Sequence, residues 1–174
     1  MVVSVRILAD YKASFAVLGL AFGISIAVVL VERNEPLKLP AMVVTPEELR
    51  WSTLAAYAMP GLEQVNLMGD PALPGRYTIR LKFPKGYRIA PHTHPDSREV
   101  TVLSGTFANG YGDTFDATKL RKLKAGSYYT EPSDVPHFIE VEEDVVLQVS
   151  GTGPSGRHFI HGMQVHGHGG DAAK

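Results

Sequence analysis

The sequence predicts an all-β fold, a barrel or sandwich built from short strands. The clearest strand signal is residues 77–83, where apolar side chains at every second position alternate with polar ones. Two further runs rich in β-branched residues, 99–103 and 137–141, border turn-forming sequences. Between residues 77 and 149 such runs recur, separated by turn residues, at the spacing typical of all-β domains.

An uncharged apolar segment near the N-terminus, residues 13–31, indicates export. It is long enough to span a bilayer, and Arg6 and Lys12 precede it. We expect residues 1–33 to contain a hydrophobic helix that acts as a signal peptide or as a membrane anchor. The positive residues would keep the N-terminus inside, so the rest of the chain would be periplasmic or secreted, either released or anchored to the inner membrane. A helix buried in the fold is the alternative.

Residues 34–75 are expected to form a linker and an N-terminal extension that packs on the barrel. Thr45 as N-cap, followed by Pro46 and two acidic residues, predicts a helix of one or two turns. Trp51, the only tryptophan, is expected to act as a lid over one end of the barrel, with a substrate platform as the alternative.

The barrel itself is expected over residues 76–152. The strands predicted there and just before it are 64–68, 77–83, 87–92, 99–108, 127–130, 137–141 and 145–150. The side chains expected to fill the interior are Tyr77, Ile79, Leu81, Phe83, Val102, Phe107, Phe138 and Val149. Residues 111–124, which are rich in lysine and arginine, are expected to form a solvated face.

Residues 153–174 are rich in glycine and histidine and are expected to be a flexible tail. They contain four of the seven histidines, namely His158, His161, His166 and His168. Binding a metal there would require a floppy segment to become ordered, so we expect only weak, adventitious binding.

Composition excludes several classes of function. The absence of cysteine rules out disulfides, a thiol nucleophile and thiolate-ligated zinc or iron–sulfur sites. A net charge of -1 gives no reason to expect a nucleic-acid partner. The length of 174 residues, with 44% hydrophobic residues, suits one globular domain.

Three histidines and one glutamate at the ends of predicted strands form a candidate metal site. His92 and His94 are two residues apart, so in a strand both point to the same face. Glu99 opens the next strand and His137 opens a later one. Imidazole and carboxylate suit divalent transition metals, so we expect one ion of Fe, Mn, Ni, Co, Cu or Zn. The alternative is that these histidines are structural or exposed.

These residues follow an order that resembles the two motifs of the cupin superfamily. The first motif corresponds to Gly86, His92, His94, Glu99 and Gly105, with five residues instead of six before the last glycine. The second motif corresponds to Gly126, Pro132, Asp134, His137 and Val141. Asp134 replaces a glycine, but aspartate tolerates the left-handed backbone angles of a turn better than most residues. Val141 replaces an asparagine.

The resemblance implies a double-stranded β-helix, also called a jelly roll, and homodimers formed through sheet edges. It implies that the metal ligands are His92, His94, Glu99 and His137. A cupin that has lost its metal is the alternative. The residues that could orient the imidazoles are Tyr128, Glu131 and Asp134, with ordinary surface placement as the alternative. Arg80 and Arg98 could pair with a substrate carboxylate.

The function expected from the resemblance is that of an exported metal-binding enzyme acting on a small organic molecule, with dioxygenase-type oxidation as the reaction. No catalytic residue is assigned. A second hypothesis is a non-catalytic module that binds or senses a ligand through its metal. A third is an isomerase or decarboxylase of a sugar or organic acid, which needs a proton-transferring residue such as Tyr128 or Glu131.

Overall fold

The computed structural model describes residues 13–19, 25–31, 39–54 and 61–161. The chain divides into two compact units, Met1–Val43 and Val44–Lys174. All the candidate metal ligands belong to the second unit.

The first unit contains two strands, β1 (Ala13–Gly19) and β2 (Ser25–Val31), which pair antiparallel. The hydrophobic helix expected over residues 13–31 is therefore not confirmed. A continuous apolar run does not by itself distinguish a helix from a strand, and this run is rich in valine and isoleucine, which favour strands. No helix in the described part of the chain is long and apolar enough to cross a bilayer.

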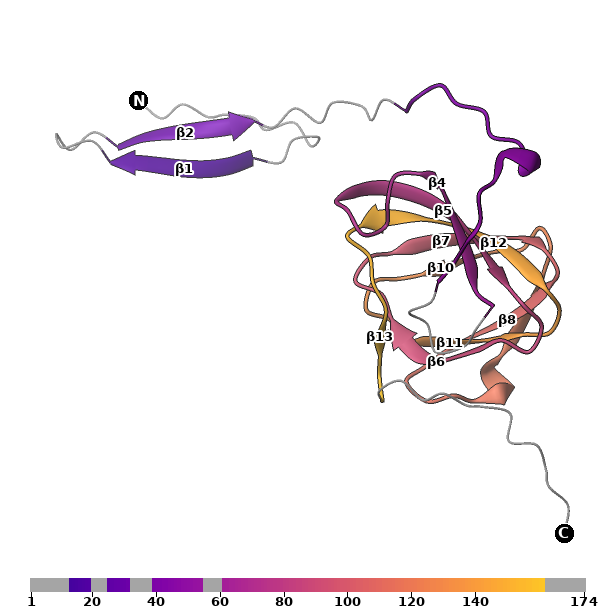
Figure 1. Cartoon of the computed structure of the whole chain (residues 1–174). Coiled ribbons are helices and arrows are strands. Elements are labelled where there is room, and N and C mark those ends of the chain that lie inside the picture. The colour runs from indigo at the N-terminus through magenta and orange to yellow at the C-terminus, as the bar shows by residue number, and fades with distance from the viewer. Residues whose placement is uncertain (1–12, 20–24, 32–38, 55–60, 162–174) are drawn as a thin grey trace, which may run out of the picture. The chain divides into compact units, whose positions relative to one another are not determined.

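The second unit is a jelly-roll barrel of two antiparallel sheets, as predicted (Figure 1). One sheet has six strands in the order β10-β7-β12-β5-β4-β3, and the other has five in the order β13-β6-β11-β8-β9. The strands of the first sheet are β3 (Ser52–Thr53), β4 (Glu63–Met68), β5 (Gly75–Phe83), β7 (Arg98–Ser104), β10 (Tyr128–Glu131) and β12 (Val145–Gly153). Those of the second are β6 (Arg88–Thr93), β8 (Thr106–Tyr111), β9 (Arg121–Lys124), β11 (His137–Val141) and β13 (His158–Phe159).

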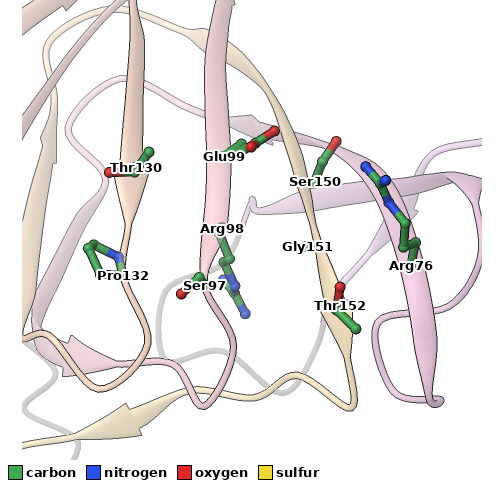
Figure 2. A pocket seen from close by; sticks show the side chains of 9 residues that line it. All are labelled: Arg76, Ser97, Arg98, Glu99, Thr130, Pro132, Ser150, Gly151 and Thr152. Carbon is green, nitrogen blue, oxygen red and sulfur yellow. The ribbon is translucent and has the colours of Figure 1, made fainter. Parts of the chain in front are cut away.

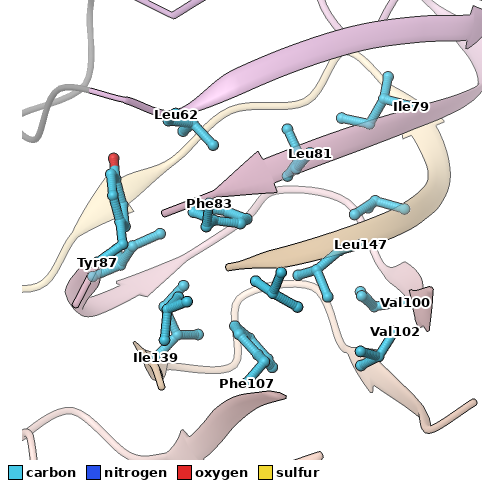
Figure 3. Packing of buried hydrophobic residues seen from close by; sticks show 14 of the residues in the cluster. Leu62, Ile79, Leu81, Phe83, Tyr87, Val100, Val102, Phe107, Ile139 and Leu147 are labelled. Atoms are coloured by element: carbon cyan, nitrogen blue, oxygen red, sulfur yellow. The ribbon is translucent and has the colours of Figure 1, made fainter. Parts of the chain in front are cut away.

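The hydrophobic core lies between the sheets, where apolar side chains from both meet (Figure 3). The eight side chains predicted to fill the interior are all buried. Seven of them belong to one cluster, whereas Phe138 packs against Phe115 with ring centroids 5.0 Å apart. Phe138 follows His137 in β11, so the two point to opposite faces of the sheet. The histidine is thereby left facing the inside of the barrel.

The single strand predicted over 99–108 is two strands, β7 and β8, because the chain reverses at Gly105. Gly105 has a φ of 77°, and a Cβ there would lie 2.1 Å from the carbonyl oxygen of Asp144. Glycine is therefore needed at this turn. Strand β9 was not predicted, but its Arg121, Lys122 and Lys124 side chains are exposed, as a solvated face requires.

The N-terminal extension joins the six-stranded sheet through β3 and β4. It begins with one turn of 3-10 helix, η1 (Pro46–Glu48), where the Thr45 backbone N–H donates to the Glu48 carboxylate at 2.7 Å. The predicted helix start is thus confirmed. Trp51, predicted as a lid, packs on the outer face of β5, with Lys82 Nζ 4.1 Å from the centre of its ring.

Residues 153–161 belong to the barrel, although a flexible tail was expected from residue 153. Strand β12 continues to Gly153, and β13 pairs with β6. Between them, the backbone N–H of Ser155 donates to Pro71 O at 2.7 Å. The residues that hold this segment in place are distant in the sequence, so its glycine-rich composition alone predicted a flexible tail. His166 and His168 lie outside the described residues.

Candidate metal centre

His92, His94 and His137 come together at one end of the five-stranded sheet. His92 lies near the end of β6, His94 follows that strand, and His137 opens β11 opposite His92. The register of the two strands slips by one residue on β6 between Ile89 and His92. A bulge of this kind redirects side chains, so Ile89 and His92 both face the interior.

The three imidazole rings are packed against one another and buried. The ring centroids of His92 and His137 are 4.2 Å apart, and that of His94 is 4.9 and 5.1 Å from them. One ring nitrogen of each lies within 4.8 Å of the others. Because each residue is at most 2% exposed, solvent hardly competes for these nitrogens.

Backbone carbonyl groups fix the orientation of each ring. The Nδ1–H groups of His92, His94 and His137 donate to Ala90 O at 2.8 Å, Gly156 O at 2.5 Å and Val135 O at 3.2 Å. A carbonyl oxygen can only accept, so each Nδ1 carries the proton and each Nε2 keeps its lone pair. Proteins orient metal-binding histidines in the same way.

Arg98 gives independent evidence for the tautomer of His94. Its Nη1 lies 3.0 Å from His94 Nε2. A guanidinium group has donors only, so His94 Nε2 must be the acceptor and Nδ1 must carry the proton. His94 Nε2 is therefore unprotonated and accepts the hydrogen bond from Arg98.

Burial keeps the three imidazoles neutral. It lowers the pKa of His92 well below 6.5, and it lowers the pKa of His94 to about 2, with the charge of Arg98 adding to the shift. Burial also lowers the pKa of His137, although the nearby Glu131 acts in the opposite direction. Neutral imidazole is the form that binds metal ions.

Glu99 is not part of this group. In β7 the side chains of Arg98 and Val100 are directed inward, so Glu99 between them is exposed on the outer face. Figure 2 shows Arg98 and Glu99 leaving the strand in different directions, although both line a groove of about 420 Å³. The position of Glu99 does not match the expectation that it completes the ligand set.

The carboxylate beside the histidines is that of Glu131, the last residue of β10. Its Oε2 lies 3.5 Å from His94 Nε2, and its Oε1 lies 3.5 Å from His137 Nε2. Glu131 is the register partner of Arg98, so both reach the site from the six-stranded sheet. The sequence suggested Glu131 as a residue that orients the imidazoles, and the structure places its two oxygens beside the Nε2 atoms of His94 and His137.

Tyr129 is a site residue that the sequence analysis missed. Its hydroxyl donates to Glu131 Oε1 at 3.1 Å, and burial raises its pKa well above 10. The predicted candidate Tyr128 is 59% exposed instead. The alternation of a strand puts residues 129 and 131 on one face, and this signal was available in the sequence.

Asp134 shapes the backbone next to the site. It has a φ of 59°, so the prediction that aspartate preserves the turn of the second motif is confirmed. Its backbone N–H donates to His94 O at 2.9 Å, which ties the turn to the metal-binding pair. Its side chain is exposed, so it does not orient an imidazole.

The residues at this site fit a metal ion. His137 Nε2 is buried and has no hydrogen-bond partner among the described residues. The lone pair of His137 Nε2 also faces Glu131 Oε1 at 3.5 Å. Such a contact is unfavourable in a buried site unless a cation lies between the groups.

A second polar group, which we call the Asp96 cluster, consists of Tyr77, Asp96, Arg98 and Ser155. The carboxylate of Asp96 accepts hydrogen bonds from the hydroxyls of Tyr77 at 2.6 Å and Ser155 at 2.5 Å. Arg98 Nη2 donates to Ser155 Oγ at 2.5 Å, and its Nε lies 3.5 Å from Asp96 Oδ1. A Cβ at Gly151 would lie 2.5 Å from the Tyr77 hydroxyl, so glycine makes room for the cluster.

A cavity of about 240 Å³ opens beside both groups. Its polar lining includes His94, Arg98, Ser155, Gly156, Arg157 and Gln64. Its apolar lining includes Leu54, Leu62, Ile79 and Leu81. A small organic molecule in this cavity would therefore touch apolar walls, two arginines and one of the candidate metal ligands.

Solved structures similar to this one show the same fold at low sequence identity. The polyketide cyclase RemF from Streptomyces resistomycificus has a TM-score of 0.59 and 13% identity, over 70% of this chain and 86% of that one. An RmlC-like cupin from Shewanella frigidimarina has a TM-score of 0.52 and 18% identity, over 65% and 91%. KdgF from Halomonas sp. has a TM-score of 0.51 and 18% identity, over 66% and 96%.

Sequence comparison places the chain more narrowly. No curated protein matches it. The family model described as the ChrR cupin-like domain matches residues 40–155, which is more than half of the chain and includes all the residues of the metal centre. The chain therefore belongs to the ChrR cupin-like domain family of the cupin superfamily.

Proposed function

We propose that this protein is a metal-dependent enzyme that acts on a small organic molecule. The observation that carries the proposal is the group of three buried imidazoles, which present their Nε2 lone pairs beside a 240 Å³ cavity. Oxidation of the dioxygenase type is the reaction we propose first. A catalytic centre needs a binding space next to its metal, and the cavity that His94 lines supplies one.

The residues that would hold the metal are His92, His94, His137 and Glu131. A divalent transition metal bound there supplies a Lewis acid with positions left for other ligands. The carbonyl groups behind the rings keep the three Nε2 atoms directed at one point. Tyr129 holds the Glu131 carboxylate by its hydrogen bond, and the aliphatic side chains of the cavity would contact the apolar part of a bound molecule.

Metal analysis of matched glutamate variants tests the centre. Purified protein without an affinity tag should contain one equivalent of a transition metal, measured by mass spectrometry. Glu131→Gln should lower the metal affinity about 10–100-fold, because a charged donor is replaced by an amide. Glu99→Gln is the matched control and should leave the affinity unchanged, because Glu99 is exposed on the outer face of β7. If only Glu99→Gln lost metal, the assignment of Glu131 would be wrong.

Oxygen consumption tests the reaction. Iron-loaded protein should consume dioxygen with at least one compound from a panel of catechols, diketones and thiols, and His137→Ala should abolish the uptake. Metal-loaded protein that binds panel compounds without any turnover would instead support the non-catalytic binding or sensing function. Turnover without oxygen uptake would support isomerase or decarboxylase chemistry, for which Glu131 is the buried proton-transfer candidate.

We also propose that the chain is exported, which rests on the uncharged run 13–31 and the basic residues before it. Fractionation of cells that express the full chain should place it in the periplasm, in the medium or with the inner membrane. A protein found wholly in the cytosol would refute this part of the proposal.

A further inference from the structure

We propose that the 240 Å³ cavity binds a small organic anion and that Arg98 is the residue that recognises its carboxylate. This inference rests on the proposed function, because it names the class of molecule that would bind beside the metal. It assigns to Arg98 a role in specificity that is separate from holding the metal.

Arg98 is positioned at the boundary between the metal centre and the cavity. Its side chain is 13% exposed and is one of the groups that line the cavity. The Asp96 cluster holds the guanidinium from behind, through Ser155 Oγ at 2.5 Å and Asp96 Oδ1 at 3.5 Å. Arg98 Nη2 also donates to Gly156 O at 3.3 Å, so Nη1 is the nitrogen that can donate to a carboxylate in the cavity. A guanidinium whose orientation is fixed in this way loses little freedom when it forms that charged hydrogen bond.

The hydrogen bond between Arg98 and His94 links anion binding to the metal. Arg98 Nη1 donates to His94 Nε2 at 3.0 Å. A metal ion on His94 would use the same lone pair, so this N–H group would then need another acceptor. The carboxylate of Glu131 is 3.7 Å away, and a second carboxylate in the cavity would provide a new acceptor next to the metal.

The charges of the described residues favour an anion once a metal is bound. Arg98 lies near two buried carboxylates, with its Nε 3.5 Å from Asp96 Oδ1 and its Nη1 3.7 Å from Glu131 Oε2, so these three groups together carry a net charge of -1. A divalent ion among neutral imidazoles would leave these groups with one uncompensated positive charge. Asp70 also lines the cavity, but it is exposed and its carboxylate accepts the backbone N–H of Ala72 at 2.9 Å. An organic anion would reduce the cost of burying this excess charge.

The rest of the cavity limits the body of the molecule. The aliphatic side chains that line it are Leu54, Leu62, Ile79 and Leu81. A volume of about 240 Å³ is below the usual range for drug-sized ligands. The expected ligand is therefore a small carboxylate with an apolar body, such as a single aromatic ring.

Calorimetric titration with benzoate and benzamide tests the inference. The two probes have the same shape and differ in charge. Zinc-loaded wild-type protein should bind benzoate at least tenfold more tightly than benzamide. Arg98→Gln should lose this preference, and Arg98→Lys should retain part of it, because lysine keeps the charge without the fixed guanidinium. Arg80→Gln is the matched control. Arg80 Nε donates to Gln148 Oε1 at 3.2 Å, and Arg80 is not among the residues that line the cavity.

Metal content measured on each sample separates the two proposals. One equivalent of zinc with equal affinity for both probes would overturn the anion inference and leave the metal centre intact. A benzoate preference that survives Arg98→Gln would also overturn it, because the metal alone would then recognise the carboxylate. Wild-type protein that retains no zinc would instead refute the proposed function. If Arg98→Gln alters zinc content, Arg98→Lys with one equivalent of zinc decides the outcome. An undiminished preference in that variant would overturn the role of the fixed guanidinium.

Discussion

At the scale of single residues, Asp96 connects the core of the barrel to the metal centre. Its two oxygens accept hydrogen bonds from Tyr77 and Ser155 and face the guanidinium of Arg98. Tyr77 belongs to the hydrophobic cluster, and burial raises the pKa of its hydroxyl to about 12. Asp96 thus joins a structural tyrosine to the arginine that we assign to ligand recognition.

Replacing Asp96 should destabilise the barrel measurably. In Asp96→Asn the amide cannot accept both hydroxyl hydrogen bonds as the carboxylate does, and the ion pair with Arg98 is lost. We expect a loss of about 1–3 kcal/mol in the free energy of unfolding, the usual cost of breaking charged hydrogen bonds in a buried site. Urea denaturation followed by tryptophan fluorescence measures it. Asp113→Asn, at an exposed position, should change stability by no more than about 0.5 kcal/mol.

At the scale of secondary-structure elements, the sequence predicted strands well where polar and apolar residues alternate. Residues 77–83 form a strand at nearly the predicted position because one of its faces is buried. The same alternation, applied to β7, puts Glu99 on the outer face with Arg98 and Val100 directed inward. The motif spacing suggested the opposite, because a spacing alone does not specify which face a residue occupies.

The features of the site that the sequence did not predict depend on distant partners. Glu131 lies in the site because β10 pairs with β7 in a register that puts it opposite Arg98. Residues 154–161 have no strand-like pattern of their own, and they are ordered by contacts with β6, Pro71 and the Asp96 cluster. Neither pairing leaves a local signal in the sequence, so both required the three-dimensional structure.

Two truncations should show that the C-terminal segment of the barrel supports the metal centre. A chain ending at His161 keeps β13 and the Gly156 carbonyl that orients His94. A chain ending at Gly153 lacks both, so its metal affinity should fall about 10–100-fold, as when partners behind a ligand are removed. Competition with a chelator measures the affinity. An equal loss in both chains would assign the effect to residues beyond 161 and contradict this interpretation.

At the scale of the whole molecule, the candidate centre joins the two sheets. The three imidazoles come from the five-stranded sheet, whereas Glu131 and Arg98 come from the six-stranded sheet. The site therefore exists only when both sheets are packed together. A bound metal should stabilise the barrel in proportion to its affinity, because it binds the folded chain and not the unfolded one.

The buried histidines should make the metal-free barrel unstable in mild acid. Their pKa values are lowered by burial, so between about pH 6.5 and those lower values the unfolded chain binds protons that the folded chain does not. Their contribution to stability is complete above about pH 6.5 and falls as the pH drops, by about 1.4 kcal/mol per pH unit for each histidine. The free energy of unfolding of a typical domain is only about 5–15 kcal/mol. The protein in excess chelator should therefore unfold between about pH 3 and 5.

Circular dichroism as a function of pH, with and without chelator, measures this transition. His161→Gln is the control, because His161 is exposed outside the cluster, and its unfolding midpoint should match that of the wild type. Added zinc should move the midpoint to lower pH, since the ion competes with protons for the same nitrogens. A barrel whose free energy of unfolding stays constant from pH 7 to pH 4 in chelator would show that the three imidazoles are not buried as neutral bases. The proposed metal centre, which depends on three buried neutral imidazoles, would then be refuted.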